Sequence, residues 1–184
     1  MADPDVDAWL PAAARGDGVA LDQIVRAYRP AVYRYCRSRL WDHETAEDVT
    51  QEVVLAMVQA LPRHRSETHT LGAFVFGIAA NHVAQAYRTR AKVAEVADDL
   101  VPDRIDETAG PEDLAVTADE IGHVMLLVDE LPESYREIVM LRVAAGLSAA
   151  EVAEVLGMSP GAVRVAQFRA LTRLRELALA GAVS

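Results

Sequence analysis

Cysteine is nearly absent from this chain of 184 residues, since Cys36 stands alone and an intrachain disulfide is therefore excluded. The five histidines lack the spacing of metal ligands, so we expect neither a metal nor another cofactor. No apolar run reaches the roughly 18 residues that cross a bilayer. The acidic start of the chain also lacks the basic and apolar regions of a signal peptide. These absences predict a cytoplasmic protein with no membrane insertion.

Catalytic motifs and aromatic residues are also scarce. The sequence has no glycine-rich phosphate loop and no plausible pair of nucleophile and base, so an enzyme is not expected. Aromatic residues make up 5% of the chain, whereas hydrophobic residues make up 52%. This combination is typical of helical proteins rich in alanine, valine and leucine, and no segment alternates as a strand does. We therefore predict an all-α fold.

The negative charge is distributed unevenly along the chain. The formal net charge is −10, and residues 93–120 contain ten acidic residues and one basic residue. Because this stretch also contains prolines and a glycine, we predict an extended, flexible linker there. Helical periodicity lies on both sides of it, over residues 21–40, 45–61, 71–92, 121–131 and 133–145. The predicted organisation is two small helical domains, residues 1–92 and 120–184, joined by an acidic linker over residues 93–119.

Residues 146–174 have the signals of a helix-turn-helix. Ser148 followed by Glu151 is a capping box, which begins a helix. Gly157 ends that helix, because glycine accepts the left-handed conformation. Ser159, with a proline directly after it, begins the next helix. Two short helices joined by a tight turn are the arrangement that places a helix in the major groove of DNA.

The second helix of this pair has a basic outward face. At about 100° per residue, Val163, Ala170 and Leu174 share one side. The other side carries Arg164, Val165, Phe168, Arg169 and Thr172. Arginines contact guanine edges or phosphates, and an apolar side chain can contact the methyl group of thymine. A helical hairpin with a solvated arginine face is the alternative, but the phenylalanine among arginines favours DNA binding.

A narrow polar strip interrupts the otherwise apolar helix predicted over residues 45–61. It contains Asp48, Gln51 and Glu52, and Leu55 lies in its middle. A leucine flanked by acids on an outward face is typical of a contact with a partner that has a basic rim. A solvated face with one exposed leucine explains the pattern equally well. Periodicity alone leaves both interpretations open. The arginines of residues 21–40 are predicted to be mostly solvated: Arg26, Arg29, Arg34, Arg37 and Arg39.

Four blocks of sequence together resemble the bacterial extracytoplasmic-function (ECF) sigma factors. The blocks are LDQIVRAYRPAVYRYCRSRL, AEDVTQEVVLAMVQALP, LGAFVFGIAANHVAQAYRTR and LPESYREIVMLRVAAGLSAAEVAEVLGMSPGAVR, in the order and spacing of that family. The tail AVRVAQFRALTRL is most similar to the sigma-D-like branch of actinobacteria. The resemblance implies sigma domain 2 in residues 1–92 and a helix-turn-helix sigma domain 4 in residues 120–184. It also implies binding to core RNA polymerase and promoter-specific initiation of transcription.

The resemblance further implies a role for each candidate surface. Binding to the β′ clamp helices of core polymerase is implied for Asp48, Gln51, Glu52 and Leu55. Recognition of the −10 element is implied for Arg63, His64 and Arg65 in the loop over residues 62–70, and for Asn81, Arg88, Arg90 and Lys92 in the next helix. Recognition of the −35 element is implied for Arg164, Val165, Phe168, Arg169 and Thr172. The expected partners are core RNA polymerase through β′ and β, promoter DNA and an anti-sigma factor.

The chain also departs from the family pattern. Gly77 and Ala80 stand where the family usually has basic residues, and Gln167 replaces an apolar core residue. Base specificity therefore cannot be transferred from other members. Two other functions compete with this interpretation: an autonomous helix-turn-helix regulator and, more remotely, a helical protein-interaction scaffold. A regulator would need a dimerisation or effector domain, and residues 1–92 do not resemble one.

Overall fold

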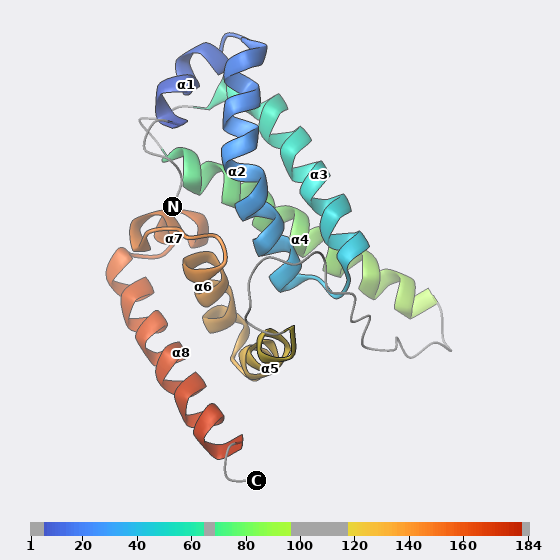
Figure 1. The fold of residues 1–184 in the computed structure, drawn as a ribbon, viewed down its shortest axis with the longest axis vertical. Helices are drawn as coiled ribbons and strands as arrows, with labels where there is room; N and C mark the ends of the chain where they lie inside the picture. Colours follow the sequence, from blue (N-terminus) through green and yellow to red (C-terminus); the bar gives the residue numbers. More distant parts are fainter. Residues whose placement is uncertain (1–5, 65–68, 97–117, 182–184) are drawn as a thin grey trace.

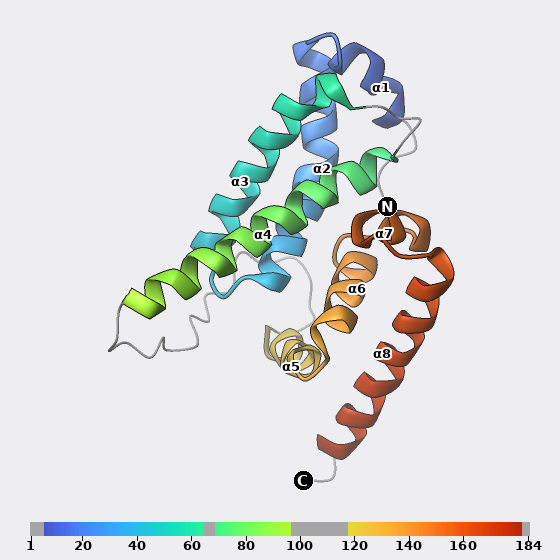
Figure 2. The same ribbon diagram turned by 180° about the vertical axis from the view of Figure 1, so that it is seen from behind.

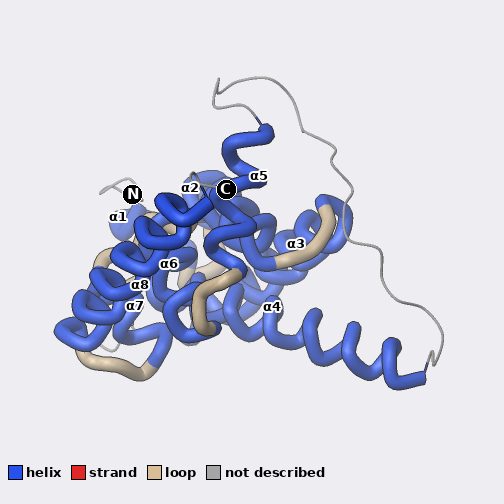
Figure 3. Tube along the Cα trace, turned by 90° about the horizontal axis from the view of Figure 1, so that it is seen from below, coloured by secondary structure: helices blue, strands red, loops and turns tan. Residues whose placement is uncertain are grey.

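The structure, a computed structural model, describes residues 6–64, 69–96 and 118–181, and within these ranges every regular element is a helix (Figures 1 and 3). The N-terminal domain comprises α1 (Val6–Ala13), α2 (Gly18–Arg39), α3 (His43–Ala60), the 3-10 helix η1 (Leu61–Arg63) and α4 (Leu71–Val96). The C-terminal domain comprises α5 (Ala118–Asp129), α6 (Glu133–Val143), α7 (Ala149–Leu156) and α8 (Pro160–Gly181). The predicted all-α fold is confirmed. None of the described helices is both long and apolar enough to cross a membrane.

Helices α1 and α4 differ most from the sequence prediction. Helix α1 was not predicted, because Pro11 lies inside it and weakens its signal. It forms where Val6 and Ala13 are buried against the rest of the domain. Helix α4 continues to Val96, four residues past its predicted end, since the added residues include alanine and glutamate, which favour helices. At the other end of the predicted linker, residues 118–119 belong to α5, and residues 97–117 lie outside the described residues.

The N-terminal domain packs α2, α3 and α4 around a common core, and α1 packs against α2. Asp17 and Asp42 begin α2 and α3, because each carboxylate accepts hydrogen bonds from backbone N–H groups of the first turn. The core contains fully buried apolar side chains, among them Ile24, Val53, Met57, Val75 and Phe76. Thr50 is buried as well, and its hydroxyl donates to the carbonyl of Ala46 at 2.7 Å, which satisfies it.

The helix-turn-helix forms from α7 and α8 as predicted. Ser148 Oγ accepts a hydrogen bond from the N–H of Glu151 at 3.2 Å, and the Glu151 carboxylate accepts one from the N–H of Ser148 at 2.8 Å. Helix α7 ends at Gly157, whose φ of 65° is left-handed. Ser159 Oγ then accepts from the N–H of Ala162 at 3.1 Å and caps α8. Local sequence therefore determines both ends of the turn that orients α8.

The two domains pack against each other. Helix α7 lies against α4 near its beginning, and α6 lies against α2 (Figures 1 and 2). The guanidinium of Arg34 on α2 donates to the carbonyl of Ala144, 110 residues away, at 3.3 Å. Buried residues of both domains belong to one hydrophobic cluster. The arrangement of the candidate surfaces therefore depends on this contact as well as on each domain's own fold.

Candidate functional site

The polar strip of α3 faces solvent. Asp48, Gln51 and Glu52 are exposed, and Leu55 among them is 59% exposed. The opposite side of α3 carries the buried Ala46, Val49, Val53 and Met57. The carboxylate of Glu52 lies 3.2 Å from Nδ1 of His82 on α4. The structure thus brings the four predicted residues into one strip, and its apolar centre with an acidic rim suits a partner of opposite charge.

The segment between α3 and α4 places basic side chains near the beginning of α4. Arg63 ends η1 and is exposed. His64 is half-buried, and its ring centroid lies 4.6 Å from that of Phe74. Arg65 lies outside the described residues. Of the three predicted residues of this segment, the structure therefore positions two, of which Arg63 is the outward one.

Three of the α4 candidates lie on one side of the helix. Asn81, Arg88 and Lys92 are all exposed. Their spacings of seven and four residues bring them within about 40° of one another around the helix axis. Arg88 is held by Gln85, whose Oε1 accepts from Nε at 3.0 Å and from Nη2 at 2.8 Å. This side offers an amide and two cations to a ligand.

Arg90 is separated from that side and lies over an aromatic ring. Its guanidinium carbon is 4.3 Å from the ring centroid of Trp41, and Tyr87 contacts the same indole edge-on at 5.6 Å. The hydroxyl of Tyr87 donates to the carbonyl of Arg39. Sequence analysis missed Trp41, because its partners lie more than forty residues away on another helix. The one available signal was a tryptophan in a chain with only two.

The outward face of α8 has the predicted composition. Arg164 and Arg169 are exposed, Val165 is 51% exposed and Phe168 is 69% exposed. Thr172 is half-buried, and its hydroxyl donates to the carbonyl of Phe168 at 2.9 Å. The inward side buries Val163, Ala166 and Ala170. A large aromatic ring held in solvent between two arginines suits a nucleic acid better than it suits water.

The unusual Gln167 has a specific partner. Its side-chain carbonyl accepts a hydrogen bond from Nε of Arg142 at 2.9 Å. Nη1 of Arg142 also donates to the carbonyl of Leu147, just before α7. Arg142 on α6 therefore links both helices of the helix-turn-helix. The amide at position 167 is tolerated in a partly buried site because it is hydrogen-bonded.

Arg39 corrects the prediction that the arginines of α2 are mostly solvated. Its side chain is only 6% exposed and pairs with Glu133 and Glu137 of α6, with Nε 3.1 Å from Oε2 of Glu137. The hydroxyl of Tyr35 donates to the same glutamate. Burial and the neighbouring Glu137 raise the pKa of Tyr35, which keeps its hydroxyl protonated. The C-terminal domain covers Arg39, which is why a pattern within α2 could not reveal its burial.

A cavity of about 940 Å³ lies between the two domains. From the N-terminal domain it is lined by Tyr35, Arg39, Ala80, Val83, Ala84 and Tyr87. From the C-terminal domain it is lined by Glu133, Ser134, Arg136, Glu137, Leu156 and Met158. Ala80 and Ala84 flank Asn81 on the α4 surface, so one edge of this cavity borders the side that carries the exposed candidates.

Cys36 is the buried titratable thiol of the N-terminal core. Burial raises its pKa from 9.0 to about 11, although a hydrogen bond with Thr50 opposes the shift. The thiol is therefore protonated and unreactive at neutral pH. Within the described ranges, no group of three or more histidine, cysteine, aspartate and glutamate side chains is placed to hold a metal ion.

Comparison with known families assigns both domains. Residues 24–93 match the family Sigma-70 region 2, and residues 122–174 match the family Sigma-70, region 4. The ECF RNA polymerase sigma factor SigD of Mycobacterium tuberculosis is 44% identical over 175 residues, covering 93% of this chain and 82% of SigD. ShbA, an ECF RNA polymerase sigma factor of Streptomyces griseus, is 41% identical over 181 residues, covering 94% of this chain and 95% of ShbA.

Solved structures share the fold. CnrH, in complex with the cytosolic domain of CnrY, superposes with a TM-score of 0.69 at 25% identity, covering 97% of this chain and 99% of CnrH. The sigma factor RpoE of Bartonella quintana, in complex with the anti-sigma factor NepR, superposes with a TM-score of 0.68 at 21% identity, covering 85% of this chain and 94% of RpoE. These likenesses extend over both helical domains.

Proposed function

The chain belongs to the extracytoplasmic-function family of RNA polymerase sigma factors. On that premise, we propose which of its surfaces binds core polymerase and which recognise the two promoter elements. It is not an enzyme: it binds core RNA polymerase and directs promoter-specific initiation of transcription. A match to two sigma regions in one chain does not favour the autonomous regulator or the scaffold. The proposal is carried by one observation: the exposed candidates form two separate surfaces of opposite charge, an acidic strip on α3 and a basic face on α8.

The α3 strip is our candidate for docking on the β′ clamp helices. Leu55 supplies the apolar centre, with Asp48 and Glu52 as the charged rim and Gln51 as a hydrogen-bonding partner. An exposed leucine is unfavourable in water, and Leu55 at the centre of the strip is 59% exposed. This exposure supports the contact interpretation over a merely solvated face. Further contact with the β subunit is part of the proposal.

Recognition of the −10 element is assigned to α4 and the segment before it. The residues are Arg63, His64, Arg65, Asn81, Arg88, Arg90 and Lys92. Support comes from the shared side of Asn81, Arg88 and Lys92, which offers an amide for base edges together with two cations for phosphates. Arg90 lies on another side of α4, where its guanidinium is held over the ring of Trp41. It would therefore contact DNA separately from Asn81, Arg88 and Lys92.

Recognition of the −35 element is assigned to the outward face of α8. Arg164 and Arg169 are the candidates for guanine or phosphate contacts, and Val165 and Phe168 for thymine methyl groups. Thr172 lies one turn beyond Phe168 and is bonded to its carbonyl. The capping box and Gly157 support this assignment, since they fix the angle at which α8 leaves α7.

Three further points belong to the proposal. The domain limits are residues 1–92 for sigma domain 2, residues 93–119 for the acidic linker and residues 120–184 for sigma domain 4. The protein acts in the cytoplasm, where polymerase and promoter are found. An anti-sigma factor is its expected regulator, and the complex of CnrH with the cytosolic domain of CnrY supports a protein partner for this fold.

Run-off transcription with core polymerase tests the proposal. The purified chain should make transcription promoter-dependent. The double reversal Asp48→Lys and Glu52→Lys should abolish holoenzyme assembly while the helical circular dichroism remains unchanged, because both positions are exposed. Asp22→Lys with Glu130→Lys makes the same change of charge at exposed positions outside the strip and serves as the matched control. Normal assembly of the strip variant would refute the docking assignment.

A further inference from the structure

We propose that His82 is a positioning residue for the binding of core RNA polymerase, because its imidazole holds the carboxylate of Glu52 in the orientation that the polymerase contacts. His82 lies on α4, next in sequence to Asn81 of the proposed −10 surface, whereas Glu52 belongs to the α3 strip. The inference rests on the proposed docking of that strip on core polymerase. It adds a residue from a different helix to the docking surface.

Glu52 lies at one edge of the α3 strip. At about 100° per residue, Gln51 and Glu52 are about 100° apart around the axis of α3, and Leu55 lies between them. Helix α4 packs against α3 (Figures 1 and 2). Across this contact, Nδ1 of His82 lies 3.2 Å from Oε2 of Glu52. Because an ionised carboxylate only accepts hydrogen bonds, Nδ1 is the donor of this bond.

The protein restricts the two partners to different degrees. The side chain of His82 is 29% exposed, and the next residue, Val83, is buried in the core. The side chain of Glu52 is 65% exposed. Ordering a long, exposed side chain when a partner binds has an entropic cost, which lowers the affinity. The partly buried imidazole already restricts the Glu52 carboxylate in the free protein, so less of this cost remains when polymerase binds.

The hydrogen bond leaves half of the carboxylate for the partner. Oε2 of Glu52 accepts from His82, and no donor in the described part of the chain bonds to Oε1. An ionised carboxylate has two acceptor oxygens, and charge-assisted hydrogen bonds from lysine or arginine are the strongest that it makes. His82 therefore orients Glu52 while one oxygen stays available to a cation of the polymerase.

The same contact keeps the apolar centre of the strip open. Residues three apart on a helix are neighbours, so the side chain of Glu52 is long enough to lie over Leu55. The hydrogen bond with His82 directs the Glu52 carboxylate towards α4 instead, and Leu55 is 59% exposed. An apolar group of the partner can then reach Leu55 beside an oriented charge, which is the arrangement expected at the centre of an interface.

Two variants of the full-length chain test this inference by biolayer interferometry on immobilised core polymerase. His82→Ala removes the donor and should raise the Kd about twofold to tenfold, the cost of ordering one more side chain on binding. His82→Asn should restore most of the affinity, because the amide nitrogen of asparagine takes the place of Nδ1 and donates to the same carboxylate. Thermal unfolding of both variants checks that the fold is kept.

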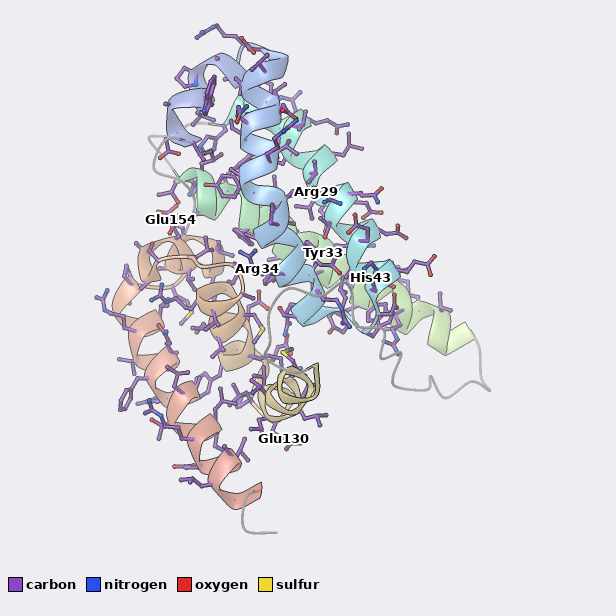
Figure 4. The ribbon with its side chains drawn as sticks, in the orientation of Figure 1. Arg29, Tyr33, Arg34, His43, Glu130 and Glu154 are labelled. Atoms are coloured by element: carbon purple, nitrogen blue, oxygen red, sulfur yellow. The ribbon has the colours of Figure 1, made fainter. Side chains whose placement is uncertain are left out.

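His43→Ala is the matched control. It removes the same kind of side chain from an exposed position where α3 begins, and the ring of His43 lies edge-on to that of Tyr33 with centroids 5.8 Å apart (Figure 4). His43 lies outside the α3 strip, so this variant should bind core polymerase with the Kd of the parent chain. A loss equal to that of His82→Ala would overturn a specific role for His82.

Glu52→Ala separates this inference from the docking assignment. This change alone should raise the Kd at least as much as His82→Ala does, and an unchanged Kd would refute the contact of Glu52 with polymerase and the inference with it. Adding His82→Ala to Glu52→Ala should cause no further loss, because His82 acts through Glu52. Additive losses, or a failure of His82→Asn to restore binding, would overturn the positioning role and leave the docking assignment intact.

Discussion

Helices α4 and α8 are both long and both carry proposed DNA contacts, yet they differ in their neighbours. The N–H of Thr70, directly before α4, donates a hydrogen bond to Glu154 of the other domain, and Ala80 on the flank of α4 lines an interdomain cavity. The corresponding face of α8 shows Arg164 and Phe168 to solvent. The candidates on one side of α4 are exposed as well, so both proposed DNA surfaces are accessible in this arrangement, and α4 in addition adjoins the contact between the domains.

The largest effect should come from removing the exposed arginines of α8. Each bidentate arginine–guanine contact contributes roughly 1–3 kcal/mol. We therefore expect Arg164→Ala with Arg169→Ala to lower run-off transcription from a −35-dependent promoter by at least about thirtyfold. Arg173→Ala removes a cation that is paired with Glu176 and should change little. Equal losses in both variants would show that α8 contributes only general charge.

Alkaline pH should lower the free energy of unfolding of the N-terminal domain. The folded pKa of Cys36, about 11, is raised by burial above its ordinary value of 9.0, so its contribution to stability is complete below pH 9 and lost between pH 9 and about 11. The free energy of unfolding should fall by roughly 2–3 kcal/mol over that window. Both tryptophans, Trp9 and Trp41, lie in this domain, so their fluorescence in denaturant titrations measures it.

Cys36→Ala is the control for this pH effect. The variant should be less stable at pH 8, because a buried side chain becomes smaller, but it should lose less stability between pH 9 and 11. Buried Tyr35 continues the decline above pH 10, because its pKa is also raised. If the variant and the parent lose equal free energy over this window, the thiol is not the group responsible.

The packing of α8 against α6 should depend on Gln167. Gln167→Leu leaves Nε of Arg142 without its partner in a partly buried site and should cost about 1–2 kcal/mol of stability. The further change Arg142→Met should recover part of this loss, since an apolar pair replaces a broken hydrogen bond. Thermal unfolding of the single and double variants measures both effects. Additive losses would argue against coupling between residues 142 and 167.

The smallest effect concerns the end of α4. Trp41→Leu removes the ring beneath Arg90, a contact that contributes about 0.5–1 kcal/mol at exposed sites. Transcription from a −10-dependent promoter should fall about twofold to fivefold. Arg90→Ala in the Trp41→Leu background should add little, because the two residues act together. A full additional loss would mean that Arg90 contacts DNA without help from Trp41.

Features that depend on neighbouring residues were predictable from sequence, and those that depend on distant residues were not. The capping box at Ser148 and the left-handed Gly157 are local, so the helix-turn-helix was predicted down to its turn. Periodicity likewise placed Phe168 and Leu55 outward. The pairing of Arg90 with Trp41 and that of Arg39 with Glu137 join residues on different helices. Their chemistry is visible only once the helices are packed.

The interdomain contact combines ion pairs with apolar packing, which has a consequence for the behaviour of the protein in solution. Separation of the domains would uncover Arg39 and its glutamates, together with buried apolar residues of the hydrophobic cluster that both domains share. Newly exposed apolar surface promotes aggregation. Conditions that hold the two domains together should therefore also keep the chain monodisperse.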